Sequence, residues 1–492
     1  MLSAISILVT SVGLWLVLAY VQGPSRREPK EPEFESAFST YSLMEWTIPL
    51  VAWLNSLEHS LPGVGQVRAA NVSSSGWIFR LLDFLDARAW RWLGMRIVRL
   101  PRASCAALVD QLKRRDAVDG GRSEKGIGLF WDALEQEHIT ASGRLMLGTL
   151  AKGLLNSRCG IAGYIDRNPE IREVRIERPV FILGCPRTAS TLLHKLLAKD
   201  PDARSPKFWE MQIPVPAVKA ETYETDPRIE LARIGLESFE AVYPTYLEDM
   251  RKFHYVDHNE IDEDVVVLHY QLLFAMYVHV SKGNSGYENF VFEPQQDHAY
   301  AFHKQVLQLL SWKHPPSTHW LLKAPLHSLY IESLLKLYPD ARIIVTHRSP
   351  LETVCSWTEF LCVHCDLFWT YPGIPKREKF EQTLRMMELM EERIQSCRKT
   401  AASAHPNVQW TDCDYGELIA DPVGTAARIY RDLEMPFSDE AGDAMRTWTE
   451  GENSKRGGRV GKAKRKHSPQ DYGFSDAEVL RRLPIWKRPG SK

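Results

Sequence analysis

The residues best suited to chemistry lie in the segment 179–200, PVFILGCPRTASTLLHKLLAKD. Four apolar residues at 180–183 precede Gly184-Cys185-Pro186, and a hydroxyl-rich turn and an amphipathic helical pattern follow. This order predicts a strand, a tight loop and the first turn of a helix. Unpaired backbone N–H groups and the helix dipole favour an anion at such a helix end. The segment therefore predicts a binding site for a phosphate or sulfate group.

The loop departs from the nucleotide-binding P-loop at the residues that matter for its chemistry. When GxxxxGK[ST] is counted from Gly184, Ala189 replaces the second glycine, Ser190 replaces the lysine, and Thr191 alone fits. A basic residue comes earlier, at Arg187. The missing lysine argues against an ATPase or a kinase, and it indicates an anion site whose cations come from other positions.

A second segment, residues 320–360, supplies such cations. Its sequence is WLLKAPLHSLYIESLLKLYPDARIIVTHRSPLETVCSWTEF. The pattern predicts a strand ending in Lys323, a helix over about 327–337, a second strand over 341–346, and then Arg348. Ser356 follows eight residues after Arg348, on the next predicted helix.

Together the two segments resemble the superfamily of sulfotransferases that use 3'-phosphoadenosine 5'-phosphosulfate (PAPS). The resemblance implies that PAPS is the co-substrate and that no metal is needed. It also implies that Lys323 faces the sulfuryl group. The 3'-phosphate would be bound by Arg348 and Ser356. The 5'-phosphosulfate would be held by the first loop, through Pro186, Arg187, Thr188, Ala189, Ser190 and Thr191.

Further elements favour the bacterial and lipid/carbohydrate-type branch of that superfamily. Each is weak alone, but their order and spacing are specific, and the resemblance covers about residues 130–480. The elements are Phe208-Trp209-Glu210 with Pro214 and Pro216, the run from Trp320 to His327, the run from Tyr415 to Pro422, and Asp471-Tyr472-Gly473-Phe474.

Sulfuryl transfer needs in-line geometry and cations where negative charge develops. By the resemblance, Arg187 and Lys323 stabilise the leaving oxygen. An acceptor hydroxyl also needs a base within hydrogen-bond reach. The cytosolic branch has a histidine where this chain has Pro325, so His327 and Glu263 are the two candidates for the base. The acidic cluster that contains Glu263 could equally cap a helix.

The pattern of apolar segments predicts an α/β fold. Short buried strands are expected at 180–185, 319–323, 341–346 and 408–411, with helices between them, which favours a P-loop-like parallel β-sheet flanked by helices. Helical periodicity covers 129–165, and 382–399 is typical of a long charged helix. We predict a transmembrane anchor over 1–23, a linker and amphipathic helical region over 24–125, a sulfotransferase domain over 126–480 and a tail over 481–492.

The N-terminus predicts a membrane anchor. Residues 1–25 carry no charged side chain, and residues 2–21 are almost all apolar, about the length that spans a bilayer. A basic n-region and a clear cleavage site are both missing, which favours an uncleaved anchor over a signal peptide. Arg26, Arg27 and Lys30 follow it, so the positive-inside rule predicts a single-pass membrane protein with a cytoplasmic catalytic domain.

Two segments each allow two interpretations. Residues 77–100 mix Trp, Leu and Phe with Arg, which is typical of an amphipathic helix at a lipid interface or of a surface helix of the catalytic domain. Residues 455–466, KRGGRVGKAKRK, could close over the nucleotide or form a solvated or lipid-facing loop.

Composition limits the partners. A net charge of −1 over 492 residues gives no sign of a nucleic-acid partner. Cys362-Val-His-Cys365 lacks the second cysteine pair of a typical zinc site, so we expect free thiols. The expected acceptor is a small hydrophobic molecule or a lipid with a hydroxyl or an amine. The alternatives are a nucleotide-dependent phosphotransferase and a non-catalytic, membrane-tethered nucleotide-binding protein.

Overall fold

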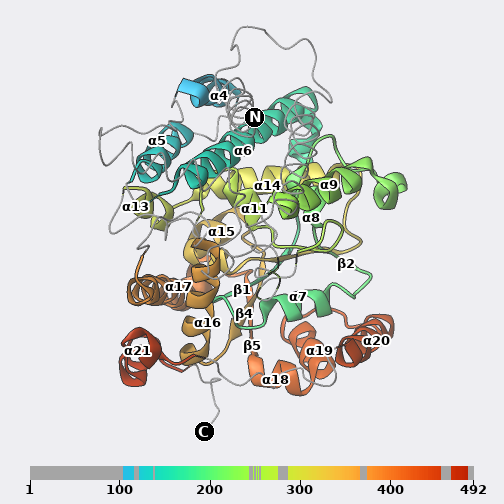
Figure 1. The fold of residues 1–492 in the computed structure, drawn as a ribbon. Helices are drawn as coiled ribbons and strands as arrows, with labels where there is room; N and C mark the ends of the chain where they lie inside the picture. Colours follow the sequence, from blue (N-terminus) through green and yellow to red (C-terminus); the bar gives the residue numbers. More distant parts are fainter. Residues whose placement is uncertain are drawn as a thin grey trace, which may run out of the picture.

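A five-stranded parallel β-sheet forms the centre of the protein (Figure 1). The computed structural model describes residues 103–115, 121–136, 139–242, 248, 251, 253, 256–274, 286–365, 374–455 and 467–485. Every neighbouring pair of strands is parallel, and the strand order is β2-β3-β1-β4-β5. The strands are β1 (Val180–Gly184), β2 (Ala203–Arg204), β3 (His319–Lys323), β4 (Arg342–His347) and β5 (Gln409–Asp414).

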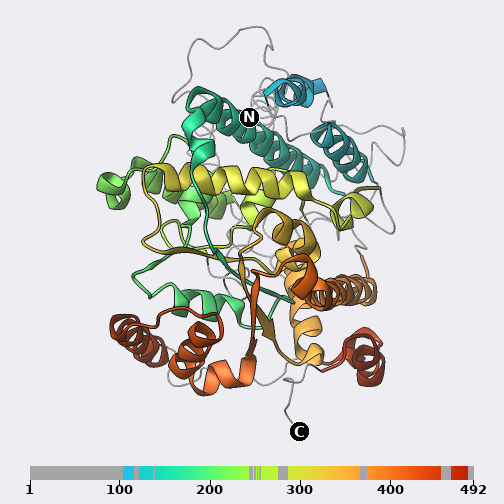
Figure 2. The same cartoon turned by 180° about the vertical axis from the view of Figure 1, so that it is seen from behind.

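Helices cover both faces of this sheet, as Figures 1 and 2 show. Phe181 and Leu183 of β1 belong to the larger hydrophobic cluster, whereas Val180 and Ile182 belong to the second one. Successive side chains of a strand point to opposite faces, so β1 must be apolar throughout. Helices α14 (Asp297–Trp312), α15 (Ile331–Leu337) and α17 (Lys376–Ala404) contribute to the larger cluster; α7 (Ser190–Leu197), α19 (Pro422–Asp432) and α20 (Asp439–Lys455) contribute to the second.

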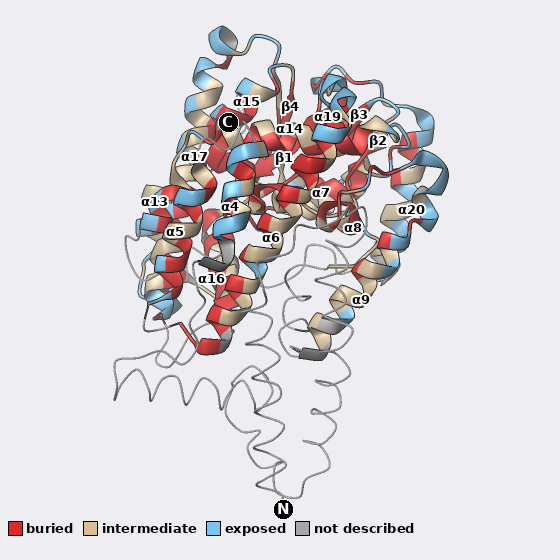
Figure 3. Ribbon diagram, turned by 90° about the horizontal axis from the view of Figure 1, so that it is seen from above, coloured by how far each residue is buried: buried red, intermediate tan, exposed pale blue. Residues whose placement is uncertain are grey.

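The first described helices extend the larger cluster. Leu112, Phe130 and Leu155 come from α4 (Ala103–Arg115), α5 (Arg122–Leu134) and α6 (Ala141–Arg167), and all three are buried in it. Figure 3 shows buried residues running through these helices and the sheet.

The remaining elements are η2 (Pro169–Glu173), α8 (Phe208–Gln212), η3 (Ala220–Thr225), α9 (Pro227–Val242), α11 (Val265–His269), α13 (Gly286–Phe292), η4 (Pro325–Tyr330), α16 (Pro350–Cys365), α18 (Tyr415–Ala420), η5 (Pro469–Tyr472) and α21 (Asp476–Arg482).

The Phe208-Trp209-Glu210 element of the sequence has a structural role, because Glu210 connects α8 to β2. Glu210 is fully buried at the start of α8, and its Oε1 accepts a hydrogen bond of 2.6 Å from Arg204 Nη2 at the end of β2. Its Oε2 accepts hydrogen bonds from the Tyr223 hydroxyl at 2.8 Å and from the Lys207 backbone N–H at 2.9 Å. A buried carboxylate requires such partners. Glu210 thereby ties α8 to the edge of the sheet.

The structure confirms the parallel sheet flanked by helices, and it adds detail that the sequence did not predict. The two-residue strand β2 was not predicted. The helix expected over 327–337 is divided into η4 and α15, and η4 starts at Pro325, which has no N–H to donate. The helical stretch expected over 129–165 is also two helices. Thr140 separates them, because its side chain caps α6 by accepting a hydrogen bond from Gly143 N.

Several predictions concern residues that the structure does not describe. The predicted anchor over 1–23, the amphipathic segment 77–100 and residues 456–466 of the basic glycine-rich loop lie outside the described residues. Among the helices that are described, none combines the length and the hydropathy needed to span a bilayer. Cys362 and Cys365 are described; both are buried on α16, and neither is in a disulfide.

We expect that Gly184→Ala destabilises the fold by about 2 kcal/mol or more. Gly184 has a φ of +131°, and an added Cβ would lie 2.6 Å from the carbonyl oxygen of Thr346. Gly153→Ala is the matched control, because Gly153 lies within α6 and a Cβ there meets no atom within 4 Å. Urea unfolding of both variants measures the difference; equal midpoints would contradict the steric argument.

Candidate active site

Hydroxyl groups of the loop itself, of η4 and of β4 hold the predicted anion loop in place. The backbone N–H of Gly184 donates to Ser328 Oγ at 2.9 Å, and that hydroxyl donates back to the Gly184 carbonyl at 3.1 Å. Thr188 Oγ1 donates to the Cys185 carbonyl at 2.8 Å and lies 2.7 Å from Thr346 Oγ1. The hydroxyl of Thr188, one of the predicted nucleotide-binding residues, is thus bonded within the protein in this structure.

The backbone of the loop itself is unusual. Arg187 and Ala189 have φ values of 70° and 68°, in the left-handed region, and Ser190 then begins α7. Few non-glycine residues adopt this conformation, and those that do cluster at functional sites. The turn brings Pro186, Arg187, Ser190 and Thr191 to the edge of one cavity.

Arg187 points across the site toward α16. Its Nε donates to Ser356 Oγ at 3.0 Å, and its Nη1 donates to the Phe253 carbonyl at 2.7 Å. Burial lowers the pKa of the Arg187 guanidinium, and the nearby Arg348 lowers it further, whereas Glu263 opposes both effects. Arg187 nevertheless stays charged at neutral pH, because guanidinium groups do not deprotonate in proteins.

Arg348 lies behind the same loop. Its Nη1 donates to the Arg187 carbonyl at 3.3 Å, its Nε donates to Glu352 Oε2 at 2.8 Å, and its guanidinium lies 4.0 Å from the centre of the Tyr415 ring. The structure thus brings Arg187, Arg348 and Ser356 together. Two guanidinium groups so close together favour a multiply charged anion between or beside them.

Lys323 ends β3 with its side chain only 1% exposed. Its ammonium donates to Thr191 Oγ1 at 3.2 Å and forms an ion pair with Glu263, whose side chain is 20% exposed. An ammonium out of contact with water requires such compensation. The pair places the lysine between the anion loop and the carboxylate.

The chain just before α11 holds Glu263 in this position. Phe208 N–H donates to the Glu260 carbonyl at 2.9 Å, and Asp262 N–H donates to the Pro206 carbonyl at 3.1 Å. Glu263 N–H donates to Asp262 Oδ1 at 2.7 Å. Residues 260–264, which we call the acidic segment, are therefore fixed to the chain that leads into α8.

His327 does not reach the cavity. It is fully buried, its Nδ1 lies 2.7 Å from the Tyr300 hydroxyl, and its Nε2 lies 2.8 Å from Asp264 Oδ2. His303 mirrors it, with Nε2 at 2.8 Å from the same oxygen and Nδ1 at 2.7 Å from the Tyr338 hydroxyl. Burial would raise the pKa of the Asp264 carboxyl, but the two imidazoles hold it well below its ordinary value.

The Asp264–His303–His327 cluster is also the place, within the described residues, where side chains could hold a metal ion. Their ligand atoms lie within 4.8 Å of one another. Ordinary hydrogen bonds explain the same geometry without a metal ion: each Nε2–H donates to the carboxylate, and each Nδ1 accepts from a tyrosine hydroxyl. The sequence did not reveal this cluster, since His303 is 39 positions from Asp264 and lies on a separate helix.

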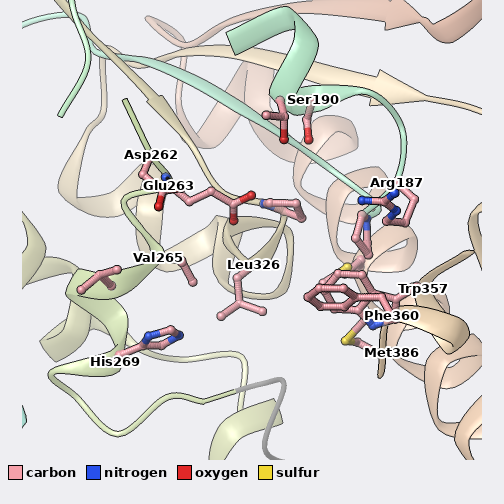
Figure 4. Close-up of a pocket in the computed structure, with 15 residues that line it drawn as sticks. Arg187, Ser190, Asp262, Glu263, Val265, His269, Leu326, Trp357, Phe360 and Met386 are labelled. Carbon is pink, nitrogen blue, oxygen red and sulfur yellow. Dashed lines mark hydrogen bonds between the residues drawn. The ribbon is translucent and has the colours of Figure 1, made fainter. Parts of the chain in front are cut away.

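The cavity has a charged half and an apolar half (Figure 4). Glu263 and Arg187 lie on opposite sides of its upper part in that view, and Leu326, Trp357 and Phe360 lie below. The apolar wall was not predicted from the sequence, although Trp357/Phe360 and Met386/Met390 are spaced to share helix faces. The cavity is lined by Pro186, Arg187, Ser190, Thr191, Asp262, Glu263, Val265, Val266, His269, Pro325, Leu326, Trp357, Phe360, Met386 and Met390.

A parallel sheet with an anion loop after β1 and cations from β3 and beyond β4 defines a group-transfer enzyme fold of the sulfotransferase type. The sequence model of the sulfotransferase family matches residues 179–439, more than half of the chain. The protein therefore belongs to the sulfotransferase family.

Two solved structures are similar to this one. Sulfotransferase STF9 from Mycobacterium avium is 24% identical with a TM-score of 0.63, over 76% of this chain and 94% of that chain. Sulfotransferase STF1 from Mycobacterium tuberculosis is 26% identical with a TM-score of 0.62, over 77% of this chain and 97% of that one. A comparison with curated protein sequences found no match.

We expect stability to fall as the pH drops from 7 to 5. Burial lowers the pKa of His194 to about 3 and that of His319 to about 4, so both are neutral in the folded protein. The unfolded chain binds their protons below about pH 6.5, so each histidine costs about 2 kcal/mol of stability at pH 5. Urea unfolding across this range measures the slope. In His194→Gln, the slope of the unfolding free energy against pH should be smaller by about one proton. A slope equal to that of the wild type would contradict the assignment to His194.

Proposed function

We propose that this sulfotransferase transfers the sulfuryl group of PAPS to a hydroxyl, or an amine, of a small apolar acceptor. The observation that carries the proposal is the position of Lys323. Its ammonium bonds Thr191 of the anion loop on one side and pairs with Glu263 of the cavity on the other. A donor anion on the loop and an acceptor in the cavity would thus meet at one buried cation.

The charge arrangement around the loop supports a bisphosphate nucleotide. Arg348 contacts the back of the loop, and Ser356 is hydrogen-bonded to Arg187. A planar guanidinium can bind a phosphate through two parallel hydrogen bonds, which suits Arg348 to the 3'-phosphate. Ser190 and Thr191, at the first turn of α7, would face the 5'-phosphosulfate.

In the proposed reaction, the acceptor oxygen attacks sulfur while the bond from sulfur to the 5'-phosphate oxygen breaks. The products are a sulfate ester and adenosine 3',5'-bisphosphate, and the hydroxyl proton passes to a base. Lys323 and Arg187 would neutralise the charge on the leaving oxygen. Glu263 is favoured as the base over His327, because Glu263 lines the cavity whereas His327 is sealed in the core with both nitrogens bonded.

Nucleotide binding tests the donor. We expect adenosine 3',5'-bisphosphate to bind tightly without metal and ATP-Mg to bind weakly, as measured by calorimetry on the full chain. Arg348→Ala should weaken bisphosphate binding about a hundredfold, since it removes charged hydrogen bonds. Arg446→Ala, which breaks an exposed pair with Asp443, is the control. Preference for ATP-Mg would indicate a phosphotransferase, and unchanged binding by Arg348→Ala would remove that residue from the site.

Replacement of the proposed base tests the chemistry. Glu263→Gln should lower kcat by roughly a hundredfold to ten-thousandfold, because an amide cannot accept the proton. Its bisphosphate affinity should be no weaker than that of the wild type, because the substitution removes a negative charge beside Lys323. Turnover is measured with radiolabelled PAPS and a panel of phenols and long-chain alcohols. Glu260→Gln is the matched control, since Glu260 pairs with Lys195 on the surface. An unchanged kcat in Glu263→Gln would rule out Glu263 as the base.

A further inference from the structure

One polar side chain stands apart in the apolar half of the cavity. Val265, Leu326, Phe360 and Met386 line this half, and His269 lies among the lining residues at the end of α11 (Figure 4). In Figure 4, His269 lies at the far end of the cavity from Ser190, with Val265 between them. An apolar ligand alone would leave this imidazole without a partner.

His269 has unused hydrogen-bonding capacity. Its ring packs against Phe274 at 5.1 Å between ring centres, and it makes no hydrogen bond to any described residue. Its nitrogens are not sealed in the protein, unlike the indole Nε1 of Trp357 on the opposite wall, which is buried. Burial lowers the pKa of His269 to about 4, so at neutral pH the ring is uncharged and offers one donor and one acceptor.

Three other buried histidines among the described residues have hydrogen-bond partners for their rings. His303 and His327 bond to Asp264 and to tyrosines, and His194 lies 3.1 Å from Ser205 Oγ. Polar groups away from bulk water nearly always have a partner, so an unpaired one that faces a cavity is suited to a ligand. Unlike these three histidines, His269 lines the cavity.

We propose that His269 determines acceptor specificity by hydrogen-bonding a second polar group of the acceptor, remote from the hydroxyl that is sulfated. The inference rests on the proposed function. The preferred acceptor is then an apolar molecule with two hydrogen-bonding groups, one beside Glu263 and Lys323 and one beside His269. Glu263 precedes α11 and His269 ends it, so the two groups of the acceptor are separated by at least the length of this one-turn helix.

The energetic basis is the cost of an unpaired polar group. An acceptor without the second group buries the imidazole against carbon, which loses the hydrogen bonds that His269 made to water. Sites built to bond a substrate hydroxyl reject analogues that lack it far more strongly than apolar pockets reject an extra methylene. His269 therefore selects against purely apolar alcohols without touching the reacting atoms.

Matched acceptor pairs test the proposal on the full-length protein. The pairs are octanol with octanediol and phenylphenol with dihydroxybiphenyl, and kcat/KM is measured with radiolabelled PAPS. For the wild type, kcat/KM should be about tenfold or more higher for the dihydroxy member of a pair. This ratio is taken after division by two, because either of its two hydroxyls can be sulfated. His269→Phe should lose this preference, and His269→Gln, which can still donate and accept, should keep most of it. Bisphosphate affinity should be the same in all three proteins, which also reports that the variants fold.

Each other outcome overturns a distinct step. Bisphosphate binding and turnover with no change of preference in His269→Phe would overturn the role of His269 and leave the sulfotransferase proposal intact. Bisphosphate binding without turnover of any panel member would overturn the apolar acceptor, and the inference with it. Failure of the wild type to bind bisphosphate would overturn the proposed donor itself.

Discussion

The site depends on one buried charge. Lys323 ends a central strand where its ammonium is almost completely removed from water. Leaving a cation uncompensated in such a place costs several kcal/mol, so a carboxylate must reach it. Glu263 does so from the acidic segment, and Thr191 supplies a hydroxyl from α7. This requirement joins three elements that are distant in the sequence, and it draws the anion loop and the cavity together.

The neighbouring residue carries a second buried charge, and it fixes the acidic segment from the other side. Asp264 is fully buried, and two histidines from α14 and η4 donate to one of its oxygens. Glu263 therefore faces the cavity while Asp264 faces the core. A shift of the acidic segment would break both sets of contacts at once, which makes His327 and His303 positioning residues for Glu263 even though neither lines the cavity.

Much of the fold and part of the site could be predicted from the sequence, for identifiable reasons. Strands buried on both faces carry continuous apolar runs, so β1, β3 and β4 could be recognised from their central residues. The strand β2 has two residues and no such run. The resemblance to the sulfotransferase family pointed to Arg187, Arg348 and Ser356, and the structure brings these three residues together. The Asp264 cluster and the wall of Trp357 and Met386 could not be predicted, because each depends on how separate helices pack. His327 looked suitable as a base by type and spacing, but spacing does not reveal which way a side chain faces.

The position of Lys323 also explains how the loop works without the P-loop lysine. In a P-loop the cation comes from the first turn of the helix, but that position here is Ser190. Lys323 lies beside Ile182 in the parallel register of β3 with β1, so its side chain approaches the same helix from the adjacent strand. Because Lys323 comes from the strand, its ammonium contacts Thr191 on the side of the loop and Glu263 on the side of the cavity. A lysine within the loop could not make both contacts. Because the anion loop and Glu263 share this one ammonium, a change at either side alters the electrostatics of the other.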